Sequence, residues 1–216
     1  VLTAGHCIQY QGDFAPPSEI HIYRGVQVIE RLQVSDWVMH HEWVSGLYDG
    51  TDVALVYLAT PARTAPIQVD QTAPQQYVGQ LGKVIGFGMT NSRDDTSSGV
   101  KNSVNLKVNK ITGALYELQS YDATLRSACR GDSGGPLVFS NGVAGVASYV
   151  DGTQTDVCTN RSYYTSVYPH LAWIQENLSG VTHGRRRIED PVIDRRGAQA
   201  APSPSQPAPS PSQPAP

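Results

Sequence analysis

Residues 129–138, CRGDSGGPLV, place a serine between an aspartate and two glycines, just ahead of an apolar run. A serine hydroxyl attacks a carbonyl efficiently only when a neighbouring base takes its proton and a third group orients that base. Hydrogen-bond donors must also stabilise the oxyanion that forms. If Ser133 is a nucleophile, the chain must therefore supply a histidine and a carboxylate from elsewhere.

His6 is the histidine that the sequence context favours. It lies in TAGHC, residues 3–7, at the end of a short apolar strand and beside a cysteine that could fix it to the rest of the fold. The other histidines lie in strand, turn, helix-start or charged sequence: His21, His40, His41, His170 and His183. The segment HHEW, residues 40–43, is interpreted as a turn at the end of a strand rather than a metal site, and no metal is predicted.

Asp52 is the candidate carboxylate, because TDVALVYL, residues 51–58, places it directly before an apolar strand. An isolated aspartate at such a place is usually a turn or cap residue. Together with His6 and Ser133, however, it completes the set that serine chemistry requires.

Composition narrows the classes of protein. The 216 residues allow one or two domains, and 39% hydrophobic residues, 16% charged residues and 20 glycines fit a globular, β-rich chain. The net charge of -3 and the scattered basic residues predict no nucleic-acid partner. No apolar run approaches the roughly 20 residues of a membrane helix, so no membrane span is predicted.

The order of patterns along the chain predicts an antiparallel β fold with one late helix. Short apolar or alternating stretches separated by glycine, proline and Asn/Asp breaks predict strands: IHIYRG, VQVIERLQVSDWVM, VALVYL, GKVIGFGMT, VNLKVNKI, PLVF and VAGVASYV. PHLAWIQENL, residues 169–178, places Leu171, Ile174 and Leu178 at helical spacing, and Gly180 could end this helix.

The sequence changes character after residue 180. Residues 181–200 are charged with little periodicity and are expected to form a linker. From residue 201 the heptad APSPSQP occurs twice, and this segment, residues 201–216, is predicted to be a disordered Pro/Ser/Gln-rich tail.

Gly131–Ser133–Gly135 also fits the loose G-x-S-x-G pattern of α/β-hydrolases. That fold requires the order serine, acid, histidine, and a helix after the serine. Asp156 with His170 or His183 would supply the order, but strand-like sequence follows Ser133 and no β-α alternation precedes it. The context therefore argues against an α/β-hydrolase esterase.

Three segments together resemble the chymotrypsin-like (trypsin-fold, S1 family) serine peptidases. LTAGHC, DVALVYL and CRGDSGGPLV follow the family's order of histidine, aspartate and serine, while VIGFGMT and YYTSVYPHLAWI resemble its Gly-Trp-Gly strand and its closing strand and helix. The resemblance covers residues 1–180. It implies an all-β fold of two packed antiparallel six-stranded barrels with a C-terminal helix. Because residue 1 falls within strand-like sequence, we expect an N-terminally truncated chain with an incomplete first barrel.

The resemblance also implies roles for individual residues. His6 would be the general base and then the acid, Asp52 would orient it, and Ser133 would be the nucleophile. The backbone N–H groups of Gly131 and Ser133 would form the oxyanion hole. Asp132 matches the residue that accepts an ion pair from the new N-terminus when the family's zymogens are cleaved.

The three cysteines acquire an interpretation from the same resemblance. Cys129 and Cys158 match the disulfide that braces the family's primary specificity pocket. Cys7 matches a cysteine whose partner lies upstream of residue 1, which fits an odd cysteine count in an oxidising compartment. Three free thiols in a cytosolic protein are the alternative that composition alone leaves open.

The residues matching the specificity pocket predict the preferred substrate. Ser127 would lie at its floor, where an aspartate would select Arg or Lys, and Val150 and Ser162 would form its walls. Side chains at both walls should favour small or medium apolar P1 residues, although a one-residue shift at Ser162 would leave a wider, chymotrypsin-like pocket. Ser148 and Val150 would also lie along the edge where an extended substrate pairs.

The prediction from sequence is a secreted serine endopeptidase that acts through a His-Asp-Ser triad and an acyl-enzyme. Its expected partners are polypeptide substrates and proteinaceous inhibitors, with no cofactor, and a monomer is expected. The alternative is a catalytically silent protease homologue that serves as a binding module.

Overall fold

The computed structural model describes residues 1–151, 158 and 161–179. The residues up to Ser179 belong to one unit, Val1–Gly180, whereas the predicted linker, 181–200, and tail, 201–216, lie outside the described residues. Within the described residues, no helix combines the length and the apolar character needed to cross a membrane.

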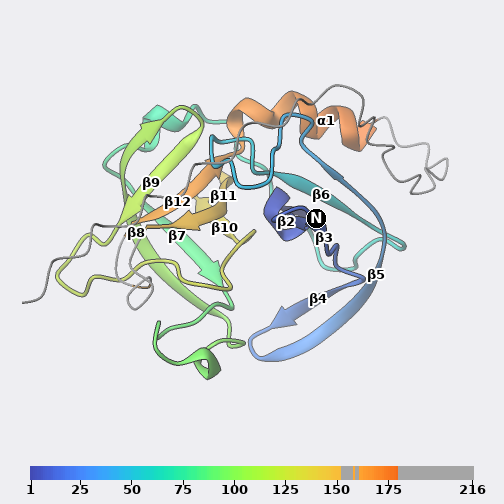
Figure 1. Cartoon of the computed structure of the whole chain (residues 1–216), viewed down its shortest axis with the longest axis horizontal. Helices are drawn as coiled ribbons and strands as arrows, with labels where there is room; N and C mark the ends of the chain where they lie inside the picture. Colours follow the sequence, from blue (N-terminus) through green and yellow to red (C-terminus); the bar gives the residue numbers. More distant parts are fainter. Residues whose placement is uncertain (152–157, 159–160, 180–216) are drawn as a thin grey trace, which may run out of the picture. The chain divides into compact units, whose positions relative to one another are not determined.

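The C-terminal half forms a closed antiparallel barrel of six strands in the order β10-β11-β12-β9-β8-β7 (Figure 1). The strands are β7 (Leu81–Gly86), β8 (Asn102–Thr112), β9 (Leu115–Gln119), β10 (Pro136–Phe139), β11 (Gly142–Val150) and β12 (Ser162–Ser166). Alternation in β8 directs Leu106 and Val108 inward, where they join Tyr116, Leu137 and Tyr164 in the barrel core. The predicted second barrel is therefore present.

The N-terminal half forms a curled four-stranded sheet in the order β1-β6-β5-β4. Its strands are β1 (Leu2–Thr3), β4 (Glu19–Arg24), β5 (Gln27–Met39) and β6 (Ala54–Leu58), while β2 (Gln9–Tyr10) and β3 (Asp13–Phe14) form a separate hairpin. Ile8, Ala54 and Val56 are buried in its core. Among the described residues this sheet is open, as the prediction of an incomplete first barrel required.

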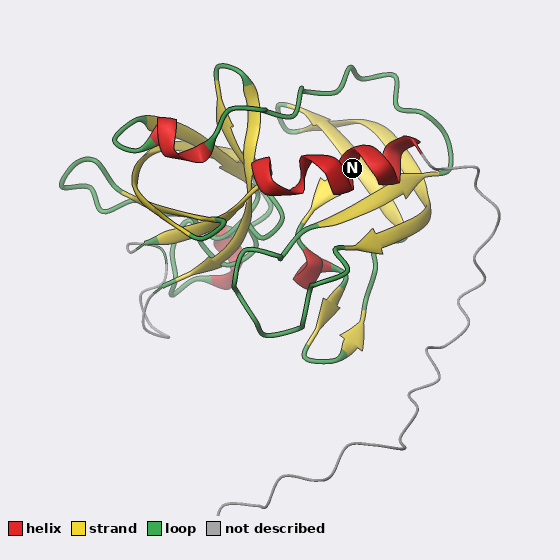
Figure 2. Ribbon diagram, turned by 90° about the horizontal axis from the view of Figure 1, so that it is seen from above, coloured by secondary structure: helices red, strands yellow, loops and turns green. Residues whose placement is uncertain are grey.

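A third apolar cluster joins the two sheets to the C-terminal helix. It contains Ala4, Val53, Val146, Val167 and Ile174, which come from both halves of the chain and from the helix α1 (Leu171–Ser179). Figures 1 and 2 show α1 extending from the barrel toward the four-stranded sheet, where the Tyr57 hydroxyl of β6 donates a hydrogen bond to the Asn177 carbonyl at 3.1 Å. Since Ala4 and Val53 lie close to His6 and Asp52 in sequence, this cluster fixes the segments that carry the candidate site.

Four 3-10 turns complete the described elements, and the last one changes where the helix begins. They are η1 (Gly5–Cys7), η2 (Pro74–Tyr77), η3 (Asp95–Ser97) and η4 (Tyr168–His170). The expected helical start at Pro169 lies within η4, and the α-helix begins at Leu171. Ile174 is buried as its spacing predicted, but Leu178 is 59% exposed, because the last turn of the helix extends past the core.

Candidate active site

His6 and Asp52 form a hydrogen-bonded pair between the start of the chain and the loop before β6. Nδ1 of His6 lies 2.8 Å from Oδ2 of Asp52, and the His6 backbone N–H donates to Oδ1 at 2.9 Å. Asp52 is fully buried, whereas the His6 side chain is 13% exposed. A carboxylate bound to Nδ1 fixes the tautomer and the direction of the imidazole, which leaves Nε2 available for proton transfer.

Ser148 provides a third contact to the Asp52 carboxylate. Its hydroxyl donates to Oδ2 at 2.6 Å within a fully buried environment. Ser148 lies at the irregularity in β11 between Ala147 and Tyr149, where the pairing with β12 shifts by one residue. Such a bulge redirects a side chain, and here the hydroxyl of the predicted substrate-edge residue lies against Asp52. The sequence offers no signal for this contact, because the two residues are 96 positions apart.

Ser133 lies on an exposed loop that packs against the loop of His6. The Gly134 N–H donates to the Ala147 carbonyl at 2.9 Å, which ties the loop to β11. Gly134 has φ +75°, and a Cβ atom there would lie 2.2 Å from Thr3 Oγ1 and 3.1 Å from Cys7 Sγ. Only glycine permits this approach. The structure thus brings the serine and histidine loops together, although no Ser133–His6 hydrogen bond is present among the described residues.

The backbone N–H groups of Gly131 and Ser133 are both without a protein acceptor in the part of the chain that the structure describes. Gly131 has φ +91°, a backbone conformation that L-residues with side chains rarely adopt. Unpaired backbone N–H groups in the loop of an exposed serine are the type of donor that can stabilise an oxyanion.

Asp132 directs its carboxylate to backbone amides. Oδ1 accepts from the Gly88 N–H and Oδ2 accepts from the Cys129 N–H, each at 2.8 Å. The residue also lines a cavity of about 340 Å³ together with Met89 and Ser127. The amino group of Val1 lies elsewhere, where it donates to the Val56 carbonyl at 2.6 Å.

The residues predicted to form the specificity pocket are neighbours in the barrel. Val150 of β11 pairs with Ser162 of β12, and the buried Ser162 hydroxyl accepts a hydrogen bond from the Ala128 N–H at 2.9 Å. Ser127, which precedes Ala128, is half-buried, and its hydroxyl donates to the Ala128 carbonyl at 2.7 Å. Of these predicted residues, only Ser127 lines the 340 Å³ cavity beside Asp132.

The predicted disulfide between Cys129 and Cys158 is present, with the two Cα atoms 4.6 Å apart. Cys7 is half-buried and forms no disulfide within the described residues, so an upstream partner for it stays a prediction. Burial raises the pKa of the Cys7 thiol. Because the thiolate is the nucleophilic form, the thiol beside His6 is a poor alternative to Ser133.

Sequence reasoning missed a row of tyrosine rings that begins beside His6. The Tyr48 ring contacts His6 edge-on at 6.4 Å, Tyr149 lies 5.0 Å from Tyr48, and Tyr163 stacks on Tyr149 at 4.3 Å. Tyr149 could have been found, because it lies between Ser148 and Val150. Tyr48 carries no motif, and only the fold brings it to His6.

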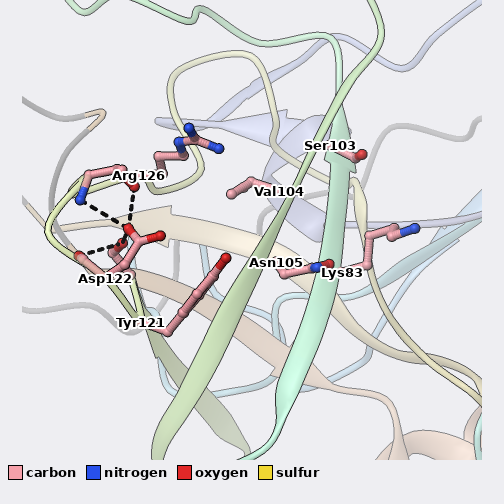
Figure 3. Close-up of a pocket in the computed structure, with 9 residues that line it drawn as sticks. Lys83, Ser103, Val104, Asn105, Tyr121, Asp122 and Arg126 are labelled. Carbon is pink, nitrogen blue, oxygen red and sulfur yellow. Dashed lines mark hydrogen bonds between the residues drawn. The ribbon is translucent and has the colours of Figure 1, made fainter.

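A second, polar cavity of about 270 Å³ adjoins the 340 Å³ cavity, with which it shares Ser103, Val104 and Arg126 (Figure 3). Lys83 and Arg126 line it, and the Asp122 carboxylate accepts hydrogen bonds from Ser120 and Thr124. None of the predicted site residues lines this cavity.

Comparison with known proteins identifies the family and the fold. The family model described as Trypsin matches residues 1–174. The chain is 30% identical over 196 residues to a chymotrypsin of Phaedon cochleariae, with 81% of this chain and 67% of that protein covered. It is 26% identical over 200 residues to snake venom serine proteinase 14 of Crotalus adamanteus, with 84% and 75% covered.

A solved structure of neuropsin, a serine protease expressed in the limbic system of mouse brain, shares the fold. Its TM-score is 0.66 at 21% identity, over 82% of this chain and 83% of that one. The family match over 174 residues, the barrel and the order of the histidine, aspartate and serine segments lead to one conclusion. The chain belongs to the trypsin family of chymotrypsin-like serine peptidases.

Proposed function

We propose that this protein is a secreted serine endopeptidase in which His6, Asp52 and Ser133 carry out peptide-bond hydrolysis. The observation that carries the proposal is the buried, hydrogen-bonded Asp52–His6 pair on a loop that packs against the exposed Ser133 loop. The Cys129–Cys158 disulfide supports an oxidising, extracellular compartment.

The chemistry begins when the Ser133 hydroxyl attacks the substrate carbonyl carbon and passes its proton to Nε2 of His6. The N–H groups of Gly131 and Ser133 donate to the resulting oxyanion. His6 then gives the proton to the leaving amine, and an acyl-enzyme remains on Ser133. Water attacks this ester with His6 again as the base, which releases the carboxylic acid product and restores the serine. Asp52 stays ionised and stabilises the imidazolium throughout.

The specificity pocket that we propose has Ser127 at its floor and Val150 and Ser162 at its walls. A neutral floor offers no charge to hold Arg or Lys, and side chains at both walls leave room for small or medium apolar P1 residues. Ser148 and Val150 of β11 would supply the backbone edge for an extended substrate. The expected partners are therefore polypeptides, both substrates and proteinaceous inhibitors, and the enzyme acts as a monomer.

Activation by cleavage of a precursor is part of the same proposal. Asp132 would accept an ion pair from the amino group that cleavage exposes. The cavity of about 340 Å³ that Asp132 lines supports this role, because it gives a chain terminus a place beside the carboxylate.

The alternative function is a catalytically silent homologue that uses the same fold to bind a partner. The missing hydrogen bond between Ser133 and His6 among the described residues favours it. Yet catalytic hydrogen bonds are often long before substrate binds, and all three reactive side chains are intact.

A peptide library distinguishes the two functions. Wild-type protein, after proteolytic activation, is incubated with the library and the products are identified by mass spectrometry, with Ser133→Ala as the control. We expect cleavage after Ala, Val or Leu that the Ser133→Ala variant lacks. Cleavage after Arg or Lys would contradict the pocket assignment, and no cleavage by folded, activated wild type would favour the binding module.

A further inference from the structure

The turn that follows β5 carries two histidines and a glutamate in succession. We propose that His40, His41 and Glu42 bind a divalent transition-metal ion of the Zn²⁺ class, at a site separate from the proposed active site. One potential ligand atom from each residue lies within 4.8 Å of the other two. The sequence HHEW was interpreted as a turn rather than a metal site. The structure has that turn, and the turn is what brings the three side chains together.

His40 is held in place by its backbone. Its N–H donates to the Val53 carbonyl at 3.0 Å, and its own carbonyl accepts from the Trp43 N–H at 2.9 Å, which closes the turn. His40 is 7% exposed, whereas His41 and Glu42 are exposed. The site therefore combines one fixed ligand with two that can move.

The rings around His40 fix the direction of its imidazole. His170 meets it edge-on at 4.6 Å, and Trp173 of α1 lies 5.1 Å away. His170 is itself anchored, because its Nε2 lies 2.7 Å from the Gly50 carbonyl. On the open side, the His41 ring stacks on His40 at 4.5 Å with an angle of 28°. A ligand with a fixed orientation lowers the entropy cost of binding a metal.

The donor set matches the preferences of Zn²⁺. Two imidazole nitrogens and one carboxylate oxygen are ligands that this ion takes at about 2.0–2.2 Å, with water or another group in the fourth position. Tetrahedral ligands at that bond length lie about 3.4 Å apart. The ligand atoms, now up to 4.8 Å apart, must therefore approach one another, and the exposed side chains of His41 and Glu42 can do so by rotation about their χ angles.

One ring nitrogen of His40 is only weakly engaged. The present partner of its Nδ1 is the Glu42 N–H at 3.3 Å, a long hydrogen bond. A metal bond would replace this weak contact at small cost.

The proposal is tested by isothermal titration calorimetry of the 216-residue chain with Zn²⁺, and by the visible absorption of Co²⁺ as a substitute ion. All proteins carry Ser133→Ala to prevent self-cleavage. His41→Ala and Glu42→Gln each remove one exposed ligand and leave the buried His40 in place. His21→Ala is the matched control, because His21 is another partly exposed histidine, with Glu19 and Arg31 as its partners. His6→Ala reports on binding at the proposed active site.

We expect one equivalent of Zn²⁺ to bind, with affinity at least tenfold weaker in His41→Ala and Glu42→Gln and unchanged in His21→Ala and His6→Ala. Co²⁺ should give visible bands that His41→Ala removes. The proposal is overturned if the parent protein shows no saturable binding. It is equally overturned if His6→Ala or His21→Ala, rather than the turn variants, abolishes binding.

Discussion

Replacing Ser148 with alanine should destabilise the protein through the Asp52 carboxylate. The Ser148 hydroxyl donates to Oδ2 of Asp52 at 2.6 Å, and Asp52 is fully buried. Removal of this donor leaves one oxygen of a buried charge with a single partner, the imidazole of His6. Unsatisfied buried charge is costly because water cannot replace the lost hydrogen bond.

The expected magnitude follows from the charge on the acceptor. Hydrogen bonds to ionised groups contribute about 1.5–3 kcal/mol, against about 0.5–1.5 kcal/mol between neutral groups. We therefore expect Ser148→Ala to lower the free energy of unfolding by about 1.5–3 kcal/mol. For a chain of this size the melting temperature should fall by roughly 3–12 °C. In an Asp52→Asn background the same change should cost only about 0.5–1.5 kcal/mol, because the acceptor is then neutral.

Guanidinium unfolding at pH 7 measures these differences in proteins that carry Ser133→Ala and retain the Cys129–Cys158 disulfide. Ser35→Ala is the control, because the exposed Ser35 hydroxyl donates to a neutral carbonyl at 3.3 Å, and its loss should change stability by no more than about 0.5 kcal/mol. If Ser148→Ala is no more destabilising than Ser35→Ala, or if its cost is the same in the Asp52→Asn background, the Ser148 hydroxyl does not stabilise a charged Asp52.

Three further predictions concern the packing of the Ser133 and His6 loops, the loss of stability at acid pH, and the specificity pocket. Gly134→Ala should lower kcat/KM and should reduce stability by more than the roughly 1–2 kcal/mol of strain expected for Gly12→Ala. Both glycines have positive φ, but only Gly134 is crowded by neighbouring atoms. Denaturation and peptide hydrolysis measure the two effects, and equal effects of the two substitutions would contradict the packing of the serine and histidine loops. The Thr64 hydroxyl and the backbone N–H groups of Arg63 and Thr64 lower the pKa of Glu30, so its stabilising effect is present above the usual value of 4.5 and is lost as pH falls through the lowered pKa. Melting curves should show Glu30→Gln less stable than wild type at pH 7 and the gap closing in acid, whereas a gap independent of pH would count against this. Ser127→Asp should shift cleavage toward Arg and Lys in the peptide library, and an unchanged preference would remove Ser127 from the pocket floor.

Much of the fold follows from patterns that are visible in the sequence. Alternation predicts β8, where Leu106 and Val108 are buried between exposed neighbours. The strand β9 was not predicted, because its residues Leu115 to Leu118 are all buried and do not alternate. Glu117 is among them, although a glutamate is usually a surface residue. Its carboxylate accepts a hydrogen bond from the Asn109 side chain at 2.6 Å and forms an ion pair with Lys110 at 3.2 Å. A buried charge with partners supplied by another strand cannot be recognised locally.

In the candidate site, too, some features could be predicted from the sequence and others could not. His6, Asp52 and Ser133 each lie in a motif of their own, so they could be named before the structure was known. The Ser148–Asp52 hydrogen bond and the ring contacts of Tyr48 depend on how the barrel and the four-stranded sheet meet. No local sequence pattern predicts which residues come into contact where the barrel and the sheet pack together. The ring contact between His40 and His170 also depends on the fold, because the two residues are 130 positions apart in the sequence.

Labelling of the full-length, proteolytically activated protein with a fluorophosphonate probe tests directly whether His6 activates Ser133. We expect wild type to be labelled on Ser133, Ser133→Ala to remain unlabelled, and His6→Ala to lose nearly all labelling. Removal of Ser133 should also lower kcat for peptide hydrolysis on the order of 10⁶-fold. Labelling of another serine, or none in folded and activated wild type, would contradict the proposal that His6 activates Ser133.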